Sequence, residues 1–204
     1  MGRGITVALA ALGALACWAP VASAAPTQID FGFNYFNPDD VTVDFVPGEN
    51  TVEWNRIEQP GIYHSITANG GSFQTGPSGF TDYDRRISAG TYPYYCVNHG
   101  GNAGVMDGVV AVRPITGEIN ADDFDVIWAG QGTQTGTSFA SRWKKQGQTK
   151  WKIWHSSIEA KHRAFGANNN PTDVKPGKTY LIQVRSSIPG SSKWSPKLSV
   201  TVEP

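Results

Sequence analysis

The stretch YPYYCVNHGGNAGVM, residues 92–106, contains the rarest side chains of this 204-residue sequence. Beyond residue 24, Cys96 is the only cysteine and Met106 the only methionine, and His99 lies between them. A thiolate, an imidazole and a thioether are donors that soft and borderline transition metals prefer. Because all three donors fall within one short loop, they can be directed at a single ion.

This donor set predicts copper. Two imidazoles and a thiolate in a trigonal plane, with a weak axial methionine, form the blue-copper electron-transfer site. The second imidazole is expected from His64 on an earlier strand over residues 62–67. The predicted metal ligands are therefore His64, Cys96, His99 and Met106, holding one type 1 copper ion.

The surroundings of the four ligands predict close backbone packing. Gly100, Gly101 and Gly104 suit the close approach of chain segments that a tight ligand loop demands. Amide groups near the sulfur would tune the copper potential, and Ser65 or Asn98 is placed to contribute one.

Residues 1–24 are predicted to be a secretory signal peptide. Arg3 provides the basic start, residues 5–18 are mostly apolar, and Ala22-Ser23-Ala24 matches the small-residue cleavage pattern. The apolar core is short for a membrane span, so a membrane anchor is the less favoured alternative. A lipid anchor at Cys17 is a further alternative, although the residue three positions before it is not leucine.

We therefore expect a periplasmic or secreted protein that does not span the membrane. In an oxidising compartment a lone cysteine such as Cys96 requires an explanation, which is either an intermolecular disulfide or a bound metal. A buried copper–thiolate bond would protect the thiol, so the cysteine count also favours a metal.

Short segments rich in β-branched and aromatic residues, separated by Gly, Pro and Asn, predict an all-β fold of two β-sandwiches. In the first half we expect an antiparallel sandwich. Its strands should lie near residues 31–35, 41–45, 51–54, 62–67, 83–88, 91–97 and 107–112. In the second half we expect strands near residues 124–128, 138–144, 149–154, 179–185 and 198–202.

Charge divides the chain into two unlike halves. Residues 27–113 carry four Lys/Arg against ten Asp/Glu, a net charge of −6. Residues 114–204 carry twelve against seven, a net charge of +5, so the halves are expected to attract each other or different partners. No dense basic run extends beyond Lys144-Lys145, which argues against nucleic-acid binding.

Residues 45–112 resemble the plastocyanin/azurin group of cupredoxins. The similarity lies in PGENTVEW at residues 47–54, the His64 segment, GTYPYYCVNH at residues 90–99, and MDGVV at residues 106–110. It implies a Greek-key β-sandwich, a type 1 copper site, and electron transfer through the exposed edge of His99. The loop between His99 and Met106 is longer than is usual in this group, and Ser65 stands where Asn is common.

The second half resembles a fibronectin type III domain, an immunoglobulin-like β-sandwich. KPGKTY at residues 175–180 and the partial signature SKWS at residues 192–195 carry this resemblance. It implies a spacer or a module that binds another protein or a polymer. The expected domains are therefore 1–24 signal, 27–113 cupredoxin, 114–118 linker and 119–204 fibronectin-like.

Two further clusters of polar residues are candidate metal sites. His155, Glu159 and His162 would share one face if they lay on a helix, and that face would suit zinc, although the surrounding sequence favours strand and loop. Asp39, Asp40, Asp82 and Asp84 are expected to be solvated, with a calcium or partner site as the alternative.

Three functions fit these residues, and none of them is an enzyme. The favoured one is an exported single-electron carrier with an unidentified redox partner. The others are a copper storage or delivery protein, and an adhesion module with a structural copper site. A copper oxidase or nitrite reductase needs more histidines than the four in this chain.

Overall fold

A computed structural model describes residues 25–48, 51–58, 61–76, 82–100, 105–132, 138–188 and 192–203. The predicted signal at 1–24 lies outside the described residues. In the described ranges, no helix combines the length and apolar character needed to cross a membrane.

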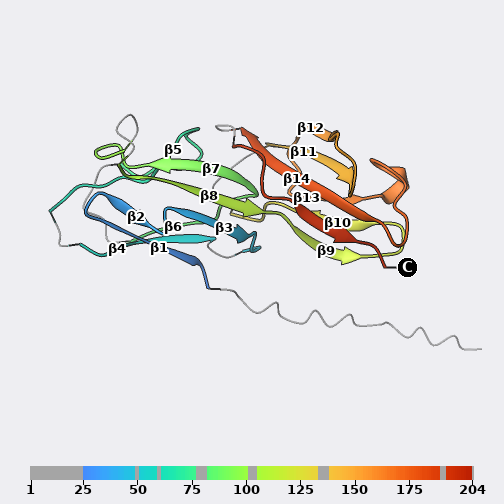
Figure 1. Ribbon diagram of the computed structural model, residues 1–204, viewed down its shortest axis with the longest axis horizontal. Coiled ribbons are helices and arrows are strands. Elements are labelled where there is room, and N and C mark those ends of the chain that lie inside the picture. The colour runs from blue at the N-terminus through green and yellow to red at the C-terminus, as the bar shows by residue number, and fades with distance from the viewer. Residues whose placement is uncertain are drawn as a thin grey trace, which may run out of the picture.

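The first half of the chain forms two four-stranded sheets, ordered β2-β1-β4-β6 and β3-β8-β7-β5 (Figure 1). Their strands are β1 (Thr27–Gly32), β2 (Tyr35–Asn37), β3 (Asp40–Asp44), β4 (Val52–Arg56), β5 (Thr67–Ala68), β6 (Asp82–Arg85), β7 (Gly90–Tyr95) and β8 (Asp107–Arg113). Trp54, Tyr92 and Tyr94 are among the largest side chains buried in this core.

The second half forms a three-stranded sheet, β13-β10-β9, and a four-stranded sheet, β12-β11-β14-β15. Its strands are β9 (Ile115–Ile119), β10 (Phe124–Ile127), β11 (Ser138–Lys145), β12 (Lys152–Ile158), β13 (His162–Phe165), β14 (Thr179–Ile188) and β15 (Leu198–Thr201). A separate core contains Trp128, Trp143 and Tyr180. The predicted all-β class with two sandwiches is confirmed.

The first sandwich is not purely antiparallel, contrary to expectation. Strand β1 pairs with β4 and β3 pairs with β8 in parallel. Parallel neighbours need a crossover connection rather than a hairpin, and both pairs join segments that are distant in sequence. Period-two alternation reports which face is buried and carries no information about strand direction.

Three local expectations are also corrected. The segment 31–35 is a hairpin rather than one strand, because Phe33 and Asn34 have φ of 47° and 68° and turn β1 into β2. Of the expected strand 62–67 only Thr67 lies in a strand, the two-residue β5 (Thr67–Ala68). Most of the expected linker 114–118 lies in β9, which pairs with β10.

Strand β7 runs from the contact between the two sandwiches to the candidate site. Near its start, Thr91 and Lys193 exchange backbone hydrogen bonds of 3.0 and 2.9 Å, and the Thr91 hydroxyl donates to the Trp194 carbonyl at 2.9 Å. Its other end leads directly to Cys96. Figure 1 shows the two sandwiches end to end, with β7 running away from the second one.

Candidate metal centre

Three of the four predicted ligands converge at the end of β7. The Cys96 sulfur lies 3.7 Å from Nδ1 of His64 and 3.5 Å from Nδ1 of His99. One donor atom from each residue lies within 4.8 Å of the others. His64 and Cys96 are buried and His99 is partly exposed. Among the described residues, this is the only such grouping of His, Cys, Asp and Glu.

The two sulfur–nitrogen distances fit one metal ion. Metal bonds of about 2.0 Å to nitrogen and about 2.3 Å to sulfur, at about 120° to each other, separate the sulfur from a nitrogen by about 3.7 Å. Both sulfur–nitrogen distances are close to this value. One thiolate and two imidazoles are also the equatorial donors of a type 1 copper site. The residues present therefore fit copper.

A tight turn after β7 directs Cys96 and His99 to the same point. The N–H groups of His99 and Gly100 both donate to the Cys96 carbonyl, at 3.2 and 2.6 Å. A Cβ atom at Gly100 would lie 2.5 Å from the Met106 carbonyl oxygen, so only glycine fits there. The close approach predicted at Gly100 is thus observed, whereas Gly101 and Gly104 lie outside the described residues.

Ser65 joins the His64 segment to the Cys96 loop. Its backbone N–H donates to the Cys96 sulfur at 3.3 Å, and its hydroxyl accepts the Val97 N–H at 2.7 Å. The two bonds hold the His64 segment against the cysteine ligand. The side chain of Asn98 instead donates to the Tyr63 carbonyl at 2.7 Å, away from the sulfur.

Met106, the fourth predicted ligand, is completely buried in the first core. Its carbonyl accepts the Cys96 N–H at 3.0 Å. The backbone therefore ties Met106 directly to the cysteine ligand. The axial role of its thioether remains a prediction.

A buried carboxylate that sequence reasoning did not identify completes the surroundings of His64. Glu58 is buried and bonds to Nε2 of His64 through Oε1. The same oxygen accepts Arg56 Nη2 at 3.2 Å, and Oε2 accepts the Phe33 N–H at 2.7 Å. The one available signal was a carboxyl group six residues before a candidate ligand.

Burial lowers the pKa of His64 below its ordinary value of 6.5, and the positive charges of His99 and Arg56 lower it further against the opposing effect of Glu58. Burial acts to raise the pKa of Glu58, but the Phe33 N–H, His64 and Arg56 outweigh it, so that pKa lies below its ordinary value of 4.5. Both shifts favour a neutral imidazole beside an ionised carboxylate.

These shifts predict that acid destabilises the metal-free protein. With a lowered pKa in the folded state, His64 takes up a proton first in the unfolded chain, so the free energy of unfolding falls as the pH drops below about 6.5. Stability from ionised Glu58, present above about 4.5, is lost as the pH falls further. Urea denaturation at a series of pH values measures both losses of stability.

The matched control for this prediction is His64→Gln, which should lose part of the slope just below pH 6.5. His155, whose pKa is also lowered by burial and by Arg163, contributes equally to both proteins. An unchanged slope in the variant would contradict the assignment to His64.

The zinc alternative is wrong. His155 lies on β12 and His162 on β13, so these residues do not share a helix face. Nδ1 of His155 instead bonds to the Ser141 hydroxyl at 2.9 Å. The i, i+4, i+7 spacing aligns side chains only on a helix.

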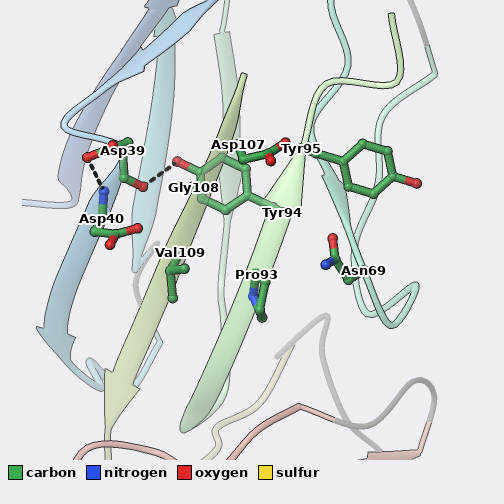
Figure 2. Close-up of a pocket in the computed structure, with 9 residues that line it drawn as sticks. All are labelled: Asp39, Asp40, Asn69, Pro93, Tyr94, Tyr95, Asp107, Gly108 and Val109. Carbon is green, nitrogen blue, oxygen red and sulfur yellow. Dashed lines mark hydrogen bonds between the residues drawn. The ribbon is translucent and has the colours of Figure 1, made fainter. Parts of the chain in front are cut away.

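The four aspartates of the second cluster divide between two sheets. Asp39 and Asp40 line a pocket of about 650 Å³ with Asp107, and Figure 2 shows the Tyr94 hydroxyl directed at the Asp39 backbone. Asp82 and Asp84 lie on β6 in the other sheet. The four do not form one calcium site.

Known proteins resemble parts of the chain in structure only. No protein-family model and no curated protein sequence matches it. Similar solved structures include a reduced amicyanin mutant, 21% identical, covering 44% of this chain and 83% of that chain with a TM-score of 0.34. A reduced Cu(I) form of another amicyanin mutant is 20% identical over 45% of this chain and 85% of that one, with a TM-score of 0.30.

A human fibronectin type III domain is also similar in structure, 16% identical over 45% of this chain and 82% of that chain, with a TM-score of 0.35. All three TM-scores are below 0.5.

Proposed function

We propose that this chain is an exported, type 1 copper-binding protein that carries single electrons. His64, Cys96 and His99 would hold one copper ion, with Met106 as the weak axial donor. When bound, copper supplies a Cu(I)/Cu(II) couple that accepts and returns one electron. The observation that carries the proposal is the convergence of two imidazole nitrogens on one buried sulfur.

The rigidity of the surrounding chain supports a carrier. Cys96 is held by backbone bonds to the Met106 carbonyl and from the Ser65 N–H, and His64 is held by Glu58. Ligands fixed in this way move little when the charge of a bound ion changes. Small rearrangement favours rapid electron transfer.

The position of His99 supports electron exchange at one end of the molecule. It is the most exposed of the three converging ligands. Tyr63, Val97 and Val105, each next to a predicted ligand in sequence, are all more than half exposed. An apolar surface next to a partly exposed imidazole would suit close, short-lived contact with a redox partner.

The second sandwich leaves this end accessible. It contacts the opposite end of β7, through Thr91 and Lys193. We propose that it acts as a spacer, or as a module that binds another protein or a polymer. The signal at 1–24 would direct the chain to the periplasm or the exterior.

Copper binding by the purified mature protein tests the proposal. We expect one copper per chain and an intense visible absorption band on addition of Cu(II), lost on reduction and restored on oxidation through many cycles. A colourless complex would refute the type 1 site. Rapid release of copper to a chelator would favour storage or delivery instead, since burial of His64 and Cys96 predicts slow exchange.

A further inference from the structure

We infer that Glu58 is the positioning residue of the metal site, which fixes His64 as a ligand through Nδ1. This inference rests on the proposed copper function. It assigns a role to a residue that contacts the imidazole on the side opposite to the metal donors.

The bonding of Glu58 determines which imidazole nitrogen carries the proton. An ionised carboxylate can only accept hydrogen bonds, so Nε2 of His64 must donate to it. In a neutral imidazole, the other nitrogen then has a free lone pair. That nitrogen, Nδ1, is the one facing the Cys96 sulfur at 3.7 Å. The carboxylate therefore selects the tautomer that a metal at this place requires.

Glu58 is itself held from two further directions. Arg56, whose side chain is 3% exposed, donates to Oε1 at 3.2 Å and also to the Ile62 carbonyl at 2.5 Å. The Phe33 N–H donates to Oε2 at 2.7 Å. The bonds that Arg56 donates to Glu58 and to the Ile62 carbonyl link the end of β4 to the segment that carries His64.

The hairpin turn between β1 and β2 is shaped around this carboxylate. Phe33 adopts a φ of 47°, a conformation that is unfavourable for a bulky residue, while its side chain remains 65% exposed. Strain of this kind persists where surrounding contacts impose it. Burial of the Phe33 side chain does not explain the turn, whereas the bond from its N–H to Glu58 does. At Gly32 a Cβ would lie 3.1 Å from the Glu58 Cβ, so glycine makes room for it.

The three donors require a carboxylate rather than an amide. A glutamine here has one accepting oxygen and one donating NH₂ group. Its NH₂ would face either the Phe33 N–H or the pair formed by Arg56 and His64. In both orientations a hydrogen-bond donor would face another donor. Loss of such a second partner of a ligating histidine weakens metal affinity by about 10–100-fold.

The tautomer of His64 in the native protein is the first test. Nitrogen NMR of the full mature chain with labelled histidine distinguishes a proton on Nε2 from one on Nδ1, in the metal-free and the Cu(I) states. We expect the proton on Nε2 in both. A proton on Nδ1 of His64 in the metal-free protein would overturn the inference, and this measurement needs no variant to fold.

Copper affinity of Glu58→Gln, measured by competition with a chelator, is the second test. We expect a loss of about 10–100-fold, together with a higher reduction potential, since removal of a negative charge beside the site disfavours Cu(II). Glu53→Gln is the matched control, because Glu53, on β4 shortly before Glu58 in the chain, loses the same charge while bonding only to Gln28 among the contacts seen for its side chain. We expect its affinity to be unchanged.

The outcomes separate this inference from the function on which it rests. A native protein with the visible band, and equal copper affinity in Glu58→Gln and Glu53→Gln, would overturn the role of Glu58 and leave the copper function standing. A native protein without the band would end the type 1 copper function, and the NMR result would then decide separately whether Glu58 orients His64.

Discussion

Replacement of Cys96 by serine is expected to abolish the intense visible band of the copper-loaded protein. The band requires a thiolate bound to Cu(II), and Cys96 is the only cysteine beyond residue 24. A serine hydroxyl is a harder, weaker donor for copper. Absorption spectra of variant and native protein, each with one equivalent of Cu(II), measure the loss, and circular dichroism checks that the sandwiches remain folded.

Met106→Leu is the matched control for this result. It removes the other soft sulfur donor and keeps the buried volume similar, so the fold should tolerate it. Because the axial bond is long and weak, we expect the band to persist with a changed reduction potential. A band that survives in Cys96→Ser would show that the thiolate is not the source of the colour and would contradict the proposed site.

Replacement of Trp54 by alanine is expected to lower the free energy of unfolding by about 3–5 kcal/mol. Trp54 is completely buried, and its ring lies 5.5 Å from the ring of Tyr94 and 5.7 Å from those of Phe73 and Tyr83. The large cavity would remove contacts on both sheets of the first sandwich. Tyr94 is two residues before Cys96, so copper affinity should fall as well. Urea denaturation measures the change in stability.

Ile153→Ala on β12 is the control, because Ile153 is 61% exposed and lies in the second sandwich. A change within about 0.5 kcal/mol is expected there. Equal destabilisation by the two substitutions would contradict the placement of Trp54 at the centre of the first core.

Much of the candidate site follows from sequence because its donors are chemically rare. Cys96 and His99 are three residues apart, and a tight turn is enough to bring them together. His64 required a longer inference, since it reaches the sulfur across 32 residues of chain. Its identification depended on the limited supply of imidazoles, four in the whole chain, and on the resemblance to cupredoxins.

The role of Glu58 could not be predicted from the sequence. Carboxylates are common and are usually solvated, so only its position six residues before His64 sets Glu58 apart from Glu53 in the sequence. The difference is burial, together with a bond to the Phe33 N–H from a turn 25 residues away. The same limit applies to the aspartate cluster. Asp107 lies in the pocket with Asp39 and Asp40 because β3 pairs with β8, and not because these residues are close in sequence.

The sequence by itself determined the strand-forming pattern, the division into two sandwiches and the identity of the soft donors. These properties depend on local alternation and on side-chain chemistry, which each residue carries with it. Tertiary structure alone decided the parallel pairing of β1 with β4, the strand in place of a linker, and the carboxylate behind His64. Each of these is a hydrogen-bonding choice between distant segments, and such choices are made only when the chain folds and water is excluded from the groups involved.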